Sequence, residues 1–190
     1  MALGFSVAGA AQFANAGTVG RLVGNAAGTL GTIALYTNSS TAYNVQSGVQ
    51  RWGDYSVTSL DPQDNMTMWT IQEFCNATNS YGCQVAQLRA PPPASVSSAN
   101  PSQVPKASSV SINIFGASSM GSGFYDSGVG FAKRLTASVS GGVIVNSVTF
   151  VSPTIVTLNL NTQFASTGLK LVTIRNPDNQ QASNSVFSVV

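Results

Sequence analysis

Four of the six carboxylates in this 190-residue chain fall within residues 54–73, and the chain contains no histidine. Acid–base and nucleophilic chemistry near neutral pH usually relies on histidine, and otherwise on paired carboxylates. Any catalytic hypothesis therefore rests on this stretch. If the chain is a glycoside hydrolase, its carboxylate pair comes from four side chains: Asp54, Asp61, Asp64 and Glu73.

Each of these carboxylates also has a structural interpretation, which we favour. Asp54 follows a glycine and is placed to cap the backbone N–H groups of a tight turn. Asp61 and Asp64 flank Pro62 as in a type I turn, and their oxygens would suit calcium, but the further spaced ligands of a known calcium loop are missing. Glu73 is either a solvent-facing strand residue or a general acid with a raised pKa. We predict no metal and no cofactor.

Arginine and aromatic side chains around the same stretch are candidates for ligand binding. Arg51 can pair with a substrate carboxylate, or instead with Asp54 or the ring of Trp52. Large aromatic rings can form a platform for sugars, although in a β protein of low charge they usually belong to the core. The candidates are Arg51, Trp52, Tyr55 and Trp69, with Tyr81 as a further platform residue.

The composition excludes some partners. Charged residues make up 7% of the chain, against about 25% in an average soluble domain. The net charge of +2 rests on eight scattered basic residues, which leaves no electrostatic footprint for nucleic acid. No apolar run approaches the roughly 18 residues that a bilayer-spanning helix needs. We therefore predict no nucleic-acid partner and no membrane span.

The two cysteines, Cys75 and Cys83, lie eight positions apart around a polar segment with β-prone sequence on both sides. This spacing predicts a hairpin whose strand ends face each other, a geometry that suits a disulfide. Two free thiols are the alternative. A disulfide together with the low charge would indicate an extracellular or cell-surface protein.

A proline-rich segment divides the chain. Three consecutive prolines, Pro91–Pro93, begin a Ser/Asn/Pro-rich stretch that continues to about Lys106. Such a run cannot join a sheet ladder and favours stiff, extended geometry. We therefore predict a β-rich unit over 1–90, a linker over 91–106 and a second unit over 107–190.

The second unit shows apolar residues at every other position in short runs separated by Gly, Asn, Pro and Ser. This pattern predicts strands of an antiparallel, immunoglobulin-like sandwich and no helix. The runs are Val110–Ile114, Leu135–Val139, Val143–Phe150, Val156–Leu160, Leu169–Ile174 and Val186–Val190.

The first unit has a less regular pattern. Residues 9–31 are rich in Ala and Gly, and the glycines at 17, 20, 24, 28 and 31 favour loops over a helix. We expect β structure with long connections. The predicted strands are Ala2–Val7, Thr32–Thr37, Tyr55–Leu60, Thr67–Phe74 and Gln84–Arg89.

Three motifs of the second unit resemble the IPT/TIG family of immunoglobulin-like domains. They are the turn Gly121–Phe124, the strand pair Val148–Thr154 and the late hairpin Val172–Asn179. Asn179 stands where that family usually has glycine, and Asn also tolerates left-handed geometry. The resemblance implies a spacer, adhesion or binding module rather than an enzyme.

The first unit resembles the closing region of large secreted bacterial β-propeller proteins of the sialidase-like, BNR-repeat kind. The segments that carry this resemblance are Arg51–Ser56, Asp61–Asp64 and Met68–Phe74. A propeller needs at least about four blades of roughly 40–50 residues. This unit holds two at most, so the chain is the end of a longer polypeptide, or its sheet edges are covered by another copy or by the second unit.

These observations favour a fold that is all-β, a propeller-blade-like antiparallel unit followed by an immunoglobulin-like sandwich. They favour a non-catalytic extracellular module for adhesion, carbohydrate binding or assembly, with a polysaccharide or glycan as its partner. One alternative is a sialidase-like hydrolase, which would also need an arginine cluster from Arg21, Arg51 and Arg89. The other is a surface-layer or fibre subunit that forms homo-oligomers through exposed sheet edges.

Overall fold

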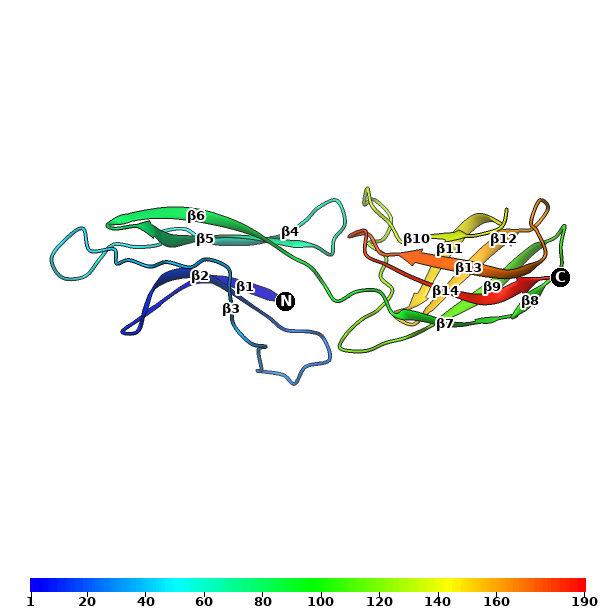
Figure 1. The fold of residues 1–190 in the computed structure, drawn as a ribbon, viewed down its shortest axis with the longest axis horizontal. Coiled ribbons are helices and arrows are strands. Elements are labelled where there is room, and N and C mark those ends of the chain that lie inside the picture. The colour runs from blue at the N-terminus through cyan, green and yellow to red at the C-terminus, as the bar shows by residue number, and fades with distance from the viewer. The chain divides into compact units, whose positions relative to one another are not determined.

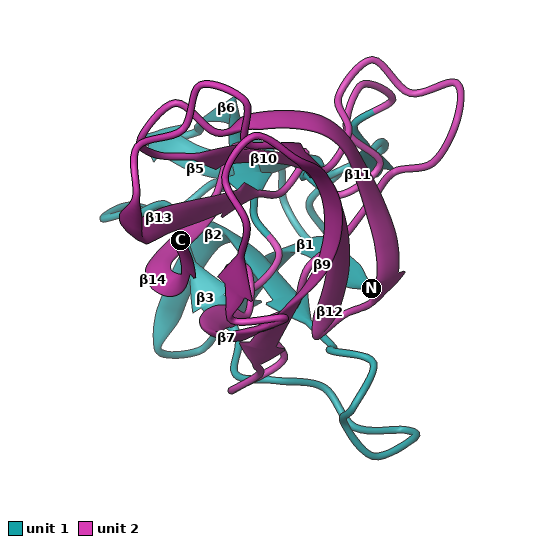
Figure 2. Ribbon diagram, turned by 90° about the vertical axis from the view of Figure 1, so that its right-hand side faces the viewer, with its two compact units in different colours: residues 1–61, 67–89 teal, residues 62–66, 90–190 magenta.

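The computed structural model describes residues 1–190 and contains 14 β-strands and no helix (Figure 1). The strands form four sheets, in which all pairings but one are antiparallel. The prediction of an all-β, sandwich-like chain is confirmed. The chain divides into two compact units, unit 1 with residues 1–61 and 67–89, and unit 2 with residues 62–66 and 90–190 (Figure 2).

Unit 1 consists of two three-stranded antiparallel sheets, which lie in two layers (Figure 1). The first contains β1 (Ala2–Gly9), β2 (Gln12–Gly20) and β3 (Ala34–Leu35). The second contains β4 (Val57–Leu60), β5 (Met68–Ala77) and β6 (Ser80–Leu88).

The two layers of unit 1 approach closely where β1 crosses β5. A Cβ atom on Gly4 would lie 2.0 Å from Thr70 Oγ1 and 2.4 Å from Gln72 Nε2, so any other residue here would force both side chains to move. Thr70 and Gln72 are buried, and the Ser6 hydroxyl donates to the carbonyl of Glu73 at 2.8 Å. The interface between these layers is therefore partly polar.

The prediction of loops over residues 9–31 is wrong for its first part, because Gln12–Gly20 is strand β2. Gly17 explains the difference. A Cβ atom there would meet Phe5, Leu35 and Val7 at 3.1–3.3 Å. The missing side chain makes room for the larger residues of β1 and β3, so this glycine serves packing rather than chain reversal.

The predicted hairpin around the cysteines is present, but the predicted disulfide is not. β5 and β6 are joined by a tight turn in which Asn79 has φ of 59°, and the register places Cys75 opposite Tyr81 and Cys83 opposite Glu73. Both thiols are free, Cys75 buried and Cys83 exposed. The two-residue turn shifts the register by two positions from the one that would set the cysteines face to face.

Unit 2 is built from two four-stranded sheets. One has the order β11-β12-β9-β7 and the other β10-β13-β14-β8, with the short β8 parallel to β14. The strands are β7 (Ser95–Asn100), β8 (Gln103–Val104), β9 (Ser109–Ala117), β10 (Thr136–Val139), β11 (Ile144–Ser152), β12 (Ile155–Asn161), β13 (Gly168–Arg175) and β14 (Gln181–Val189).

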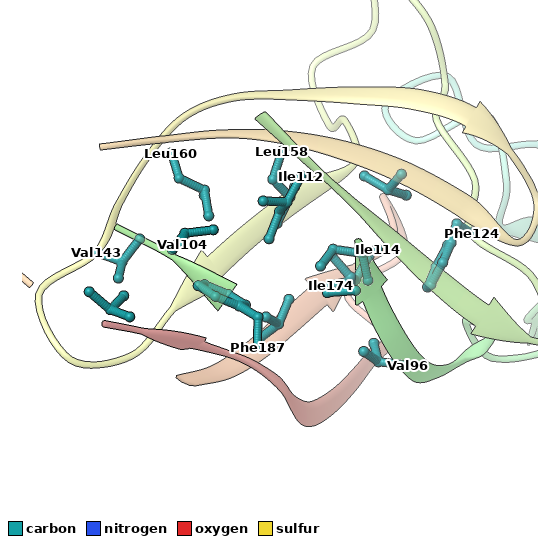
Figure 3. Packing of buried hydrophobic residues seen from close by; sticks show 14 of the residues in the cluster. Val96, Val104, Ile112, Ile114, Phe124, Val143, Leu158, Leu160, Ile174 and Phe187 are labelled. Carbon is teal, nitrogen blue, oxygen red and sulfur yellow. The ribbon is translucent and has the colours of Figure 1, made fainter. Parts of the chain in front are cut away.

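The core of unit 2 lies between these two sheets (Figure 3). Alternate residues of β9 and β12 point into it, as the period-2 pattern predicts. Ile112, Ile114, Leu158 and Leu160 are at most 1% exposed. The facing sheet contributes buried side chains from β13 and β14 in the same way, among them Ile174 and Phe187.

The segment predicted as a linker, 91–106, belongs to the sandwich over most of its length. Pro91–Pro93 are outside the strands, as expected, but the next residues form β7 and β8. Val96 and Val104 are buried in the core. The Ser-rich sequence conceals these strands because one face of an edge strand is solvated and needs no apolar residue.

Three separated motifs meet at one end of unit 2. The N–H of Phe124 donates to the carbonyl of Pro153 at 2.7 Å, and the side chain of Asn176 bonds to Gly123 and Tyr125. Asn179 has φ of 69°, which confirms that asparagine supplies the left-handed turn here.

Candidate functional site

A pocket of about 290 Å³ in unit 1 gathers most of the sequence-predicted ligand-binding residues. The long connection between β3 and β4 supplies Tyr43 and residues 51–55. Glu73 comes from β5 and Tyr81 from β6. The pocket is therefore a loop folded over the end of a hairpin.

The β5–β6 turn anchors this loop. The hydroxyls of Thr41 and Thr78 are hydrogen-bonded at 2.7 Å. The N–H of Asn79 donates to the carbonyl of Ala42 at 3.1 Å, and its side-chain oxygen accepts the N–H of Asn44 at 2.7 Å. Because Asn79 bonds the residues on both sides of Tyr43, the turn fixes where that ring lies.

Three aromatic rings form one wall of the pocket. Tyr43 and Trp52 have ring centroids 5.1 Å apart, Tyr43 and Tyr81 6.2 Å, and Trp52 and Tyr81 6.3 Å, all edge to face. Such contacts fix the ring orientations. Tyr81 is 56% exposed and Tyr55, also at the pocket, is 89% exposed, so aromatic surface remains open to solvent.

Charged groups form the other part of the lining. The guanidinium of Arg51 forms an ion pair with Asp54, with Nε 3.1 Å from Oδ2. This hydrogen bond holds the pKa of Asp54 below its ordinary value and raises the pKa of Arg51. The Glu73 carboxylate accepts the N–H of Gly53 at 3.0 Å, where Gly53 has φ of 63°. With one cation and two carboxylates, the pocket has a net negative charge.

Trp52 also borders two neighbouring cavities. One, of about 460 Å³, is mainly apolar and includes Phe13, Tyr43 and Ala8. The other, of about 190 Å³, includes Gly4 and Glu73. The indole N–H of Trp52 is buried and has no hydrogen-bond acceptor in the protein. Trp52 is therefore the residue that all three cavities share.

The structure brings together Arg51, Trp52 and Tyr55 as predicted, but not Trp69. The indole N–H of Trp69 instead donates to Asp61 Oδ2 at 3.1 Å. Sequence reasoning missed Tyr43, because no motif around it indicates a binding role. Its signal was an isolated aromatic residue in a polar connection.

The four clustered carboxylates separate into three surroundings. Asp54 and Glu73 line the pocket, and Asp61 is bound to Trp69. Asp64 is buried in unit 2, where its Oδ1 accepts the N–H of Met66 at 2.9 Å and its carbonyl accepts the Ser127 hydroxyl. Sequence proximity therefore does not make these four groups one site.

The arginine and metal hypotheses receive no support from the geometry. Of the three arginines considered, only Arg51 lines the pocket; Arg21 donates to the carbonyls of Asn25 and Ala26 in a local turn. No group of three or more His, Cys, Asp or Glu side chains is placed to hold a metal ion, so Asp61 and Asp64 do not form part of such a cluster.

Comparison with protein-family models, curated proteins and solved structures finds no significant match to this chain. None of its secondary-structure elements is a helix long and apolar enough to cross a membrane. The functional argument therefore rests on the chemistry of the pocket.

Proposed function

We propose that this chain is a non-catalytic carbohydrate-binding module of a secreted or cell-surface protein. The observation that carries the proposal is the pocket in which three mutually packed aromatic rings lie beside Arg51, Asp54 and Glu73. Binding sites for small ligands combine apolar and aromatic walls with a few placed polar groups. A sugar ring, apolar on its faces and rich in hydroxyls at its rim, matches both parts.

The charges of the pocket narrow the ligand class. Its single arginine is already paired with Asp54, and Glu73 adds a second carboxylate. An acidic sugar would meet net repulsion there, whereas neutral hydroxyls can donate to both carboxylates. Neutral glycans are therefore the proposed ligands, and sialylated glycans are disfavoured.

Binding fits the pocket better than hydrolysis does. A glycosidase general acid requires a carboxyl group whose pKa is raised. The Arg51 guanidinium shifts the pKa of Asp54 in the opposite direction. The ion pair instead provides fixed donors and acceptors at the rim of the aromatic wall.

We further propose that unit 2 is an immunoglobulin-like module of the IPT/TIG kind, and that unit 1 corresponds to blade-like sheets of a propeller-type protein. The convergence of the turn at Gly123 and Phe124 with Pro153 and Asn176 supports the first proposal. The consecutive order β4-β5-β6 supports the second, because blades are antiparallel sheets of sequential strands.

A glycan-array screen combined with turnover assays on the same preparation tests the proposed function. We expect neutral glycans to bind without being hydrolysed. Trp52→Ala should weaken binding at least about tenfold, whereas Trp69→Ala removes the other tryptophan, which lies outside the pocket, and should leave binding unchanged.

Tyr55→Ala separates loss of binding from loss of folding. Tyr55 is 89% exposed, so its removal should weaken binding without lowering stability. Absence of any glycan ligand, or equal loss with Trp52→Ala and Trp69→Ala, would contradict the proposal. Release of reducing ends from a bound glycan would favour the hydrolase instead.

A further inference from the structure

Seven of the eight sheet edges have features that discourage pairing with another chain. β3, β4, β8 and β10 are only two to four residues long, and β7 and β11 contain bulges. Natural sheets protect their edges in these ways. β1 lies against the loop of the pocket, since Gly4 and Ser6 line a cavity with Trp52 and Gly53.

β6 is the remaining edge. Its first part touches the pocket loop through Tyr81, but the rest of the strand has none of these protections. It is nine residues long, and its residues from Tyr81 to Leu88 pair with β5 without a break. It contains no charged residue and no proline. A long, regular and uncharged edge strand exposes unpaired backbone groups that can bind another strand.

The solvent-exposed face of the same sheet carries an apolar row that ends at β6. Val57 on β4 lies opposite Ile71 on β5, which lies opposite Val85 on β6. Their exposed fractions are 56%, 39% and 52%. Single exposed apolar residues are common on proteins, but this row is in register across the whole sheet and stops at the free edge.

We propose that β6 pairs with β6 of a second copy of this chain, antiparallel, about a two-fold axis at Val85. Antiparallel pairing of identical strands is isologous, so every contact is made twice. With Val85 opposite its own copy, the apolar row continues over both sheets. No like charges oppose each other, because the flanking Arg89 then lies opposite Tyr81 of the other copy, where a cation and an aromatic ring attract.

Light scattering and sedimentation equilibrium on the full chain, as a function of concentration, test this interface. Val85→Lys places like charges opposite each other and should weaken the dimer at least about tenfold. Val57→Lys is the matched control, because it adds the same charge to the same apolar row on β4, the strand farthest from the proposed interface. It should change the dissociation constant of the dimer less than about threefold. Circular dichroism and thermal melting establish that both variants fold.

A chain that stays monomeric up to about 1 mM would overturn the proposal. So would equal weakening by both lysine variants, which would indicate stacking of sheet faces rather than edge pairing. Binding of β6 to a strand of a different protein, with no self-association, would overturn it as well.

Cysteine cross-linking tests the register and needs no lysine variant. Val85→Cys in a Cys83→Ser background places two thiols opposite each other at about 4.5–5.5 Å between Cα atoms, within disulfide range. Oxidation should give a covalent dimer. In the unaltered chain the two Cys83 residues would be four strand positions out of register, about 14 Å apart, and should not cross-link. A covalent dimer of the unaltered chain through Cys83, with none from the Val85→Cys variant, would refute the Val85 axis.

Discussion

We expect the stability of the end of unit 2 where the three motifs meet to depend most on Asn176. Its side chain is 1% exposed. Oδ1 accepts the N–H of Tyr125 at 3.0 Å, and Nδ2 donates to the carbonyl of Gly123 at 2.9 Å. Asn176→Ala removes both bonds at once and leaves a backbone donor and a backbone acceptor without their partners.

The cost follows from these two groups. A buried polar group that loses its partner costs about 1–3 kcal/mol. Gly123 and Tyr125 are half-buried, so water compensates part of the loss, and we expect a decrease in the free energy of unfolding of about 2–3 kcal/mol in total. For a unit of this size, that corresponds to a fall in Tm of about 8–12 °C.

Thermal melting and urea denaturation, followed by circular dichroism, measure the loss, and hydrogen exchange locates it. Exchange of the Tyr125 amide should accelerate in Asn176→Ala. Asn176→Asp separates the two bonds, because it keeps the acceptor for Tyr125 and loses the donor to Gly123.

Asn146→Ala is the control, since Asn146 is exposed and its side-chain bond to Asn159 is on the surface. It should cost less than about 0.5 kcal/mol. If Asn176→Ala costs no more than this control, or if the Tyr125 amide stays protected, the assignment of Asn176 as the residue that joins these motifs is refuted.

Three further predictions concern packing, pH and thiol chemistry. Gly116→Ala should destabilise the chain by about 1–3 kcal/mol, because its Cβ would lie 2.7–2.9 Å from Ala94 and Phe124. Gly9→Ala is the control, since the space around Gly9 is open, and it should leave Tm unchanged in the same thermal melting assay. The hydrogen bonds from Arg134 hold the pKa of Asp126 below its ordinary value of 3.8. The ion pair therefore stabilises the folded chain fully at pH values above 3.8, and this stabilisation is lost as the pH falls below that value. Asp126→Asn should therefore lower Tm at pH 7, and the difference in Tm between this variant and the unaltered chain should decrease towards pH 2. A Tm difference that does not depend on pH would contradict the pairing of Asp126 with Arg134. A thiol reagent should modify one cysteine, Cys83, in the folded chain and both after denaturation. The absence of any reactive thiol after denaturation without reductant would restore the disulfide hypothesis.

The strands of unit 2 could be predicted well because each has one face in a common core. Every predicted run from Val110 to Val190 overlaps one of the strands β9–β14. Burial of alternate residues such as Ile112 and Leu158 leaves a period-2 pattern that sequence reveals directly. Strands without that pattern were missed. β7 is Ser-rich, and β2 contains Gly17, whose role depends on the rings and methyl groups of neighbouring strands.

The pocket could be predicted only in part, because its geometry depends on long-range bonds. Arg51, Trp52 and Tyr55 are adjacent in sequence and were identified together. Tyr43 reaches them because Asn79 holds the backbone at Ala42 and Asn44. Nothing near residue 43 in sequence indicates that contact, and loops of this length have no periodicity from which their path follows.

The ladder between β4 and β5 explains why the carboxylate cluster of the sequence is not a cluster in space. Leu60 pairs with Met68, and Asp61 lies one position further, against Thr67. Glu73 lies six positions along the strand from Thr67, about 20 Å at 3.4 Å per residue. A glycosidase pair requires about 5–9.5 Å. Asp54 and Glu73 alone share a pocket, and Arg51 keeps the pKa of Asp54 low. Within this pair, Asp54 is therefore poorly suited to protonate a leaving group, and its charged carboxylate can instead accept hydrogen bonds.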